Sequence, residues 1–148
     1  MGRGTGFMKI IVTNDQRVKV DIKKIKYLVE YTLYREGAKQ KNIEVGVLIV
    51  GNKAIKGFNK QYLKRNTVTD VISFRMWEGM SRSFSPELLG DIVVNAERAK
   101  EIAKNFEEEL YLYVVHGVLH LLGYVDDTKK HASQMQRRCE DILRRFLC

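Results

Sequence analysis

Residues 106–122 form the segment that most constrains how this chain can fold. Read as an α-helix, the segment is apolar on almost every side. Such a helix has no face to offer to water, so it must lie at the centre of a domain. Asn105 is suited to cap its start, with Glu108 in the capping-box position, and Gly123 is suited to end it. We therefore expect a buried central helix around which the rest of the chain packs.

The remaining pattern predicts strands and helices in a single domain that spans residues 1–148. This length suits one compact domain, and neither a repeat nor a Gly/Ser/Pro-rich linker divides it. Strands are expected at 8–13, 43–50, 69–77 and 91–94, and further helices at 22–36, 53–63, 96–105 and near the C-terminus. Residues 78–89 have the composition of an exposed loop or flap. The prediction is an α+β fold with a four-stranded mixed sheet and about five helices.

The central helix carries two histidines at the spacing of metal ligands. His116 and His120 lie four residues apart, so both rings project from one helical face. After Gly123 the chain can reverse, which would return Asp126 to the same point. Three protein ligands and one open position are typical of a catalytic zinc site. A single core histidine is usually hydrogen-bonded instead, but a pair at this spacing favours a metal site at the end of the helix. We expect His131 to be a solvated surface residue.

Charge is distributed unevenly along the chain, whose net charge is +8. Residues 1–75 contain sixteen Lys or Arg and six Asp or Glu, whereas residues 76–148 contain ten and twelve. A basic half favours a polyanionic partner such as RNA, although exposed lysines can equally serve solubility. No apolar run reaches the roughly eighteen residues of a membrane span. The first residues also lack the apolar core of a signal peptide, so we expect a cytoplasmic protein with no membrane partner.

The histidine spacing also fits zinc metallopeptidases at the two histidines and the following glycine. However, the glutamate that serves those enzymes as general base is replaced here by Gly117. Peptide hydrolysis would therefore lack its proton acceptor. A metal ion suits phosphodiester cleavage as well, because it polarises a phosphoryl oxygen and lowers the pKa of a coordinated water. The residues thus favour a nuclease over a peptidase.

The segment His116–Tyr124, H-G-V-L-H-L-L-G-Y, resembles the signature of the YbeY family of metal-dependent endoribonucleases. The similarity continues in Phe58-Asn59, Tyr62, Thr69–Phe74, Leu89–Val94 and Met135–Leu143. The resemblance implies an α+β enzyme of the bacterial cytoplasm that cuts single-stranded RNA. It further implies a role in 16S ribosomal RNA 3′-end maturation and ribosome quality control, with the small ribosomal subunit as a partner and one zinc ion as cofactor.

Two positions depart from the family pattern. The third metal histidine of the family falls on Asp126, so the resemblance implies zinc ligation by His116, His120 and Asp126. An anionic ligand should make a coordinated water less acidic and favour harder cations somewhat more. The functional arginine of the family falls on Leu63. Arg65 or the neighbouring Lys64 is then the candidate for the positive charge that stabilises the phosphoryl transition state.

RNA-binding candidates surround these positions. The basic side chains Lys56, Lys60 and Lys64 recur at helical steps, and Arg75 belongs to the following strand. We expect this row to border the metal cleft and to hold phosphates. Tyr124 could stack on an unpaired base. The alternatives are solvated charges for the basic residues and simple packing for the tyrosine.

Three questions stay open at this stage. Asp70 and Asp91 could act in proton transfer if they face the cleft, or each could brace the end of a strand. A metallopeptidase-like hydrolase and a non-catalytic ribosome-assembly factor with a structural metal are the alternative functions. The sequence does not indicate an oligomeric state.

Overall fold

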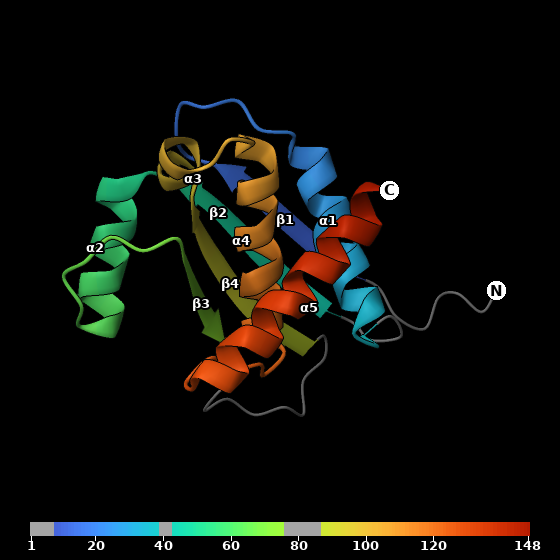
Figure 1. The fold of residues 1–148 in the computed structure, drawn as a ribbon. Helices are drawn as coiled ribbons and strands as arrows, with labels where there is room; N and C mark the ends of the chain where they lie inside the picture. The colour runs from blue at the N-terminus through green and yellow to red at the C-terminus, as the bar shows by residue number, and fades with distance from the viewer. Residues whose placement is uncertain (1–7, 39–42, 76–86) are drawn as a thin grey trace.

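A computed structural model describes residues 8–38, 43–75 and 87–148 of the chain (Figure 1). In chain order its elements are β1 (Met8–Asn14), α1 (Ile22–Arg35), β2 (Ile43–Val50), α2 (Asn52–Leu63), β3 (Val71–Arg75), β4 (Glu87–Asn95), α3 (Ala96–Ile102), α4 (Phe106–Leu121) and α5 (Lys129–Leu147). The predicted α+β fold, with four strands and five helices in the described residues, is confirmed. Most of the predicted flap, residues 78–86, lies outside those residues, as does the predicted strand end at 76–77. The fourth strand begins at 87 rather than 91, which corrects the loop expected at 87–89.

The four strands form one mixed sheet in the order β1-β2-β4-β3. The first three are parallel, and β3 runs antiparallel to β4 with Phe74 opposite Asp91. Parallel neighbours need a crossover connection, which α1 supplies between β1 and β2. The crossover from β2 to β4 contains α2 and β3, so β3 turns back and pairs on the outer edge of β4. This order brings residues 71–75 beside β4 and α4 (Figure 1).

The two faces of the sheet are covered unequally. One face, which we call the helical face, packs against α1 and α4 through the main hydrophobic core, and α5 lies on the outer side of these two helices. The other, which we call the open face, is covered by α2 at the β3–β4 side. A smaller apolar cluster there contains Val50, Ile55, Ile72 and Val93. Because successive strand residues point to opposite faces, Ile92 belongs to the helical face while its neighbour Val93 belongs to the open face.

The helix α4 is buried as its sequence predicts, with nine residues between Leu110 and Leu121 inaccessible to solvent. Its N-cap Asn105 accepts a hydrogen bond from the Glu108 backbone N–H at 3.1 Å, as the capping pattern predicts. The helix lies very close to β4 because Gly117 has no side chain. A Cβ atom at that position would be 2.5 Å from Cγ2 of Ile92.

A buried amide holds the opposite end of the sheet. The side chain of Asn95 donates to Asn52 Oδ1 at 2.7 Å and to the Thr69 carbonyl at 3.0 Å, and it accepts from Arg98 N–H at 3.1 Å. One side chain thus joins β4, α2, α3 and the approach to β3.

No helix in the described part of the chain is both long and apolar enough to cross a bilayer.

Candidate metal centre

Three predicted ligands converge where α4 ends. The Nε2 atoms of His116 and His120 are 3.0 Å apart, and Asp126 Oδ2 lies 3.6 Å from the first and 3.4 Å from the second. These atoms form a group able to hold a metal ion. Ligands about 2.1 Å from a tetrahedral zinc ion would be separated from one another by roughly 3.4 Å. The donor types and their spacing therefore fit a zinc ion without rearrangement of the backbone.

The turn after α4 brings the aspartate to the two histidines. Gly123 has a φ of 108°, a conformation that side-chain-bearing residues rarely adopt. Its N–H donates to the His120 carbonyl at 3.0 Å, and the next N–H, of Tyr124, donates to the Leu119 carbonyl at 3.0 Å. These bonds close the helix and reverse the chain within two residues. Asp126 then reaches the histidine face from outside, with a side chain that is 46% exposed.

Hydrogen bonding selects the protonation state of the His120 ring. Its Nδ1 lies 3.0 Å from the Tyr124 carbonyl oxygen, which can only accept a hydrogen bond. Nδ1 is therefore the nitrogen that carries the proton in the neutral ring, and in that tautomer the Nε2 lone pair is directed toward His116 and Asp126. Burial, followed by the neighbouring His120 ring, lowers the pKa of His116. A neutral imidazole is the form that binds a metal, and the lowered pKa favours this form of His116.

The edge strand β3 supports the same end of α4. Ser73 Oγ donates to the Gly117 carbonyl at 3.0 Å, and Arg75 Nη2 donates to the His120 carbonyl at 3.2 Å. A guanidinium group is favourable at a helix C-terminus, where carbonyl oxygens lack intrahelical partners. Arg75, predicted to bind RNA, thus lies beside the candidate metal centre and also stabilises the helix that carries it.

A second network holds the turn from the other side. The Tyr124 hydroxyl donates to Glu36 Oε1 at 2.6 Å, and Arg138 pairs with Glu36 Oε2 at 2.6 Å. Burial, and then the hydrogen bond to Glu36, raises the pKa of Tyr124. Sequence reasoning proposed Tyr124 for base stacking and missed Glu36 and Arg138. Glu36 is 88 positions from Tyr124 and 102 positions from Arg138 in the sequence, so no local pattern connects these residues.

The lysine row lies on the other side of the sheet. Lys56, Lys60 and Lys64 are exposed on and just after α2, whose buried residues pack on the open face. We expected the row to border the metal cleft, but β3 and β4 separate α2 from α4. Arg65, the proposed substitute for the family arginine, is also exposed. Leu63, which occupies the family position itself, is 44% exposed at the end of α2.

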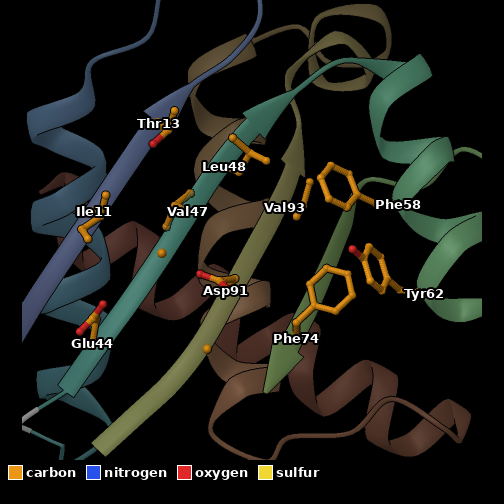
Figure 2. Close-up of a pocket in the computed structure, with 12 residues that line it drawn as sticks. Ile11, Thr13, Glu44, Val47, Leu48, Phe58, Tyr62, Phe74, Asp91 and Val93 are labelled. Atoms are coloured by element: carbon orange, nitrogen blue, oxygen red, sulfur yellow. The ribbon is translucent and has the colours of Figure 1, made fainter. Parts of the chain in front are cut away.

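The open face contains a groove of about 550 Å³ that sequence reasoning missed (Figure 2). Its wall is aromatic: the Tyr62 ring lies 5.4 Å from that of Phe74 and 6.1 Å from that of Phe58, measured between centroids. Asp91 projects into this groove (Figure 2), away from the candidate metal centre. Burial, followed by the charge of Glu44, raises the pKa of Asp91. The conditional role of Asp91 in proton transfer at the metal therefore fails on geometry.

Three remaining positions from the sequence analysis are His131, Asp70 and Gly117. His131 is exposed and its Nδ1 lies 2.6 Å from Asp127 Oδ1, so the expected surface position is confirmed. Asp70 contributes a charge that opposes the lowering of the pKa of His116. At position 117, where a metallopeptidase would have its general base, a Cβ atom would lie only 2.5 Å from Cγ2 of Ile92. A carboxylate there would collide with β4, which argues against the peptidase alternative.

Comparisons with known proteins by sequence and by structure give consistent results. The sequence matches the family described as "Endoribonuclease YbeY" over residues 10–147. Among curated relatives with that name, the protein of Syntrophotalea carbinolica is 41% identical over 109 residues, covering 70% of this chain and 73% of the relative. That of Syntrophus aciditrophicus is 33% identical and covers 91% of this chain and 88% of its own. The solution structure of TM1509 from Thermotoga maritima superposes with a TM-score of 0.57 at 26% identity, covering 90% of this chain and 88% of TM1509.

Proposed function

The chain belongs to the endoribonuclease YbeY family, and from this premise we propose that it is a metal-dependent hydrolase that cuts single-stranded RNA at internal phosphodiester bonds. One observation carries the proposal. Two imidazoles and one carboxylate meet within 3.6 Å of one another at the end of a buried helix. Structural zinc sites are usually closed by four protein ligands. Three ligands, one of them exposed, favour a site that a substrate can reach.

In this proposal His116, His120 and Asp126 hold one divalent ion, with zinc as the first choice for an N,N,O donor set. The ion would supply Lewis-acid activation of a phosphoryl oxygen and of water. The protein's own contribution is orientation. The Tyr124 carbonyl fixes the His120 ring, and burial lowers the pKa of His116, which favours the neutral form of the His116 ring. Arg75 adds a positive charge next to the triad, where it can attract the phosphodiester backbone of RNA.

The lysines of α2 complete the proposed RNA surface. Lys56, Lys60 and Lys64 are exposed and free of any ion pair shorter than 4 Å with the described acidic residues. They are suited to phosphates of a strand that extends over the β3 edge away from the metal centre. Arg65, which is exposed next to Lys64, would add a positive charge to the same strand-binding surface, a charge that Leu63 cannot supply. This arrangement assigns chemistry to one side of β3 and strand binding to the other.

We extend the proposal to the cell on the basis of the family resemblance. The substrate would be ribosomal RNA, with roles in maturation of the 16S 3′ end and in ribosome quality control. The small ribosomal subunit would be the partner, and the cytoplasm the location. A non-catalytic assembly factor with a structural metal would have the same partners but would not cleave RNA.

The direct test compares three proteins on fluorescently labelled RNA, both single-stranded and as a duplex, with added zinc or with EDTA. The wild type should cleave the single strand, and EDTA should abolish cleavage. His116→Ala combined with His120→Ala should lose cleavage while retaining salt-dependent RNA binding. His131→Ala is the matched control, because it removes an exposed histidine outside the triad. Cleavage by the double variant at the wild-type rate would reject the proposal and favour the assembly factor.

A second test isolates the aspartate. Asp126→Ala should lose zinc, measured by elemental analysis after gel filtration, because two imidazoles alone bind the ion weakly. Asp126→His should retain zinc and shift the pH optimum of cleavage downward, since a neutral ligand leaves more of the charge of the ion on its coordinated water. Unchanged zinc content in Asp126→Ala would exclude Asp126 as a ligand.

A further inference from the structure

We propose that Glu36, at the end of α1, is a positioning residue for the candidate metal centre and acts on it through Tyr124. The inference rests on the proposed function in one respect only, namely that His116, His120 and Asp126 bind a metal ion. Glu36 itself touches none of the three. Its effect is to fix the residue whose carbonyl orients His120 and whose chain continues to Asp126.

Glu36 is held firmly by its own backbone. It is the C-cap of α1, and its N–H donates to the Thr32 carbonyl at 3.0 Å. Gly37 follows with a φ of 88°, and Ala38 N–H donates to the Leu33 carbonyl at 2.9 Å. This glycine-terminated helix end leaves Glu36 little freedom to move along the helix axis. Its side chain is only 10% exposed, so the carboxylate is held inside the protein surface.

The two oxygens of the Glu36 carboxylate have separate partners. Oε1 accepts the hydroxyl of Tyr124 at 2.6 Å. Oε2 accepts from Arg138 Nε at 2.8 Å and lies 2.6 Å from Nη2 of the same guanidinium. A largely buried carboxylate requires such partners because an unpaired charge there is costly. The pair with Arg138 therefore holds the Glu36 carboxylate in place, with one oxygen left for Tyr124.

Tyr124 carries this constraint to the metal centre in two ways, through a hydrogen bond to His120 and through the backbone that leads to Asp126. Its carbonyl oxygen is the acceptor for His120 Nδ1 at 3.0 Å, which fixes the ring and its tautomer. Its backbone also precedes Asp126 by only two residues. A tyrosine anchored at its hydroxyl cannot rotate out of this position without breaking the bond to Glu36. Partners of metal-binding histidines commonly change metal affinity by ten- to a hundredfold when they are removed.

The first experiment requires no metal. Long-range 1H–15N spectra of the histidine rings report which nitrogen of His120 carries the proton in the apo protein. The wild type should have the Nδ1–H form. In Glu36→Gln and in Tyr124→Phe, His120 should become a mixture of the two tautomers. A pure Nδ1–H form in both variants would overturn the inference, whatever the function of the protein.

The second experiment measures affinity for zinc by competition with a chromogenic chelator, and geometry by the visible spectrum of the Co2+-substituted protein. Glu36→Gln and Tyr124→Phe should each weaken zinc binding by roughly tenfold and alter the Co2+ spectrum. Glu140→Gln is the matched control, since its carboxylate accepts only from Gln136 on the exposed side of α5 in the described structure, at 2.9 Å. This control should bind zinc like the wild type.

The double variant, Glu36→Gln with Tyr124→Phe, tests whether the two residues act through one hydrogen bond. Its loss of affinity should equal that of the larger single variant, because residues in one network are not additive. Wild-type affinity in both single variants, at unchanged urea stability, would overturn the inference. Wild-type protein that fails to bind zinc would instead overturn the proposed function, and the tautomer measurement would still decide the role of Glu36.

Discussion

The two faces of the sheet use the same four strands for different ends. On the helical face, α4 lies against β4 with no space for a side chain at Gly117, and the polar groups near its end have defined partners. On the open face, aromatic rings and two carboxylates line a groove in which Ile11 is 45% exposed. A close-packed, internally bonded face can hold ligands for an ion to within a few tenths of an ångström. A groove with exposed rings is suited to contact with a larger partner.

Strand alternation produces this difference at each residue pair. Ile92 supports α4, whereas its neighbours Asp91 and Val93 belong to the open face. The helices respond accordingly: α4 must be apolar all round, while α2 needs only the side that carries Ile55. The face that carries the candidate metal centre is therefore the more closely packed of the two.

The largest expected effect distinguishes two helical glycines. Gly117→Ala would bring a methyl group to 2.5 Å from Ile92, and we expect the free energy of unfolding to fall by about 2 kcal/mol, as in other overpacked cores. Gly57→Ala on α2 meets nothing within 4 Å. It should raise the free energy of unfolding by about 0.5–1 kcal/mol through helix propensity. Urea denaturation monitored by circular dichroism measures both values.

A rescue variant shows whether contact with β4 is the cause. Adding Ile92→Ala to Gly117→Ala removes the atoms in the way, so the combined loss should be smaller than the sum of the two single losses. Strict additivity, or equal effects of the two glycine substitutions, would contradict the unequal packing of the faces.

The next effect concerns RNA binding over the open side. If Lys56 and Lys60 each contact a phosphate, replacing both by Ala should lower the slope of log affinity against log salt by roughly 0.7 per contact. Between 50 and 200 mM salt the double variant would then lose roughly sevenfold less affinity than the wild type. Fluorescence anisotropy with labelled single-stranded RNA gives the slope.

Lys23 and Lys26, exposed on α1 at the helical face, provide the matched pair of substitutions. Their replacement by Ala changes net charge equally and should leave the slope almost unchanged. Equal slopes for the two double variants would mean that RNA does not distinguish the α2 side from the α1 side.

The smallest effect involves the acidic floor of the groove. Because the pKa of Asp91 is raised in the folded protein, the folded state binds this proton more tightly than the unfolded state does. Stability is therefore lost as pH rises through the raised pKa. Asp91→Asn should increase the free energy of unfolding near pH 7 by less than about 1 kcal/mol, since the carboxylate is partly screened by water. Urea midpoints measured from pH 4 to 7 should show the gain vanish at the acidic end.

Glu44→Gln refines this measurement. Removing the Glu44 charge should reduce the pH dependence of stability without abolishing it, because burial is the larger cause of the raised pKa of Asp91. A gain in Asp91→Asn that is independent of pH would show that the carboxylate behaves as a solvated group.

Local chemistry made much of this fold predictable. The caps Asp21, Asn95 and Asn105 each accept the expected backbone N–H, and Gly123 ends α4 with a positive φ. The spacing of His116 and His120 follows from helix geometry alone. These features depend on residues within four positions of one another, which a sequence displays directly.

Non-local features could not be obtained in this way. The order β1-β2-β4-β3 and the bulge between Glu44 and Val45 depend on how distant segments pair. The direction in which Asp91 points is fixed by that register, and the sequence left both directions open. The bond between Glu36 and Tyr124 requires that α1 and the turn after α4 lie side by side, which only the tertiary structure reveals.

The strand β3 contributes side chains to both faces of the sheet, so its pairing register affects both surfaces at once. Ser73 and Arg75 reach α4 from one side, while Phe74 between them forms the wall of the groove on the other. A one-residue shift of β3 against β4 would exchange these directions, directing the ring toward the histidine helix and the guanidinium toward the groove. A change of the β3 register therefore cannot alter the groove without also altering the contacts with α4. Either surface can be changed only by substituting individual residues of β3 while its pairing register stays the same.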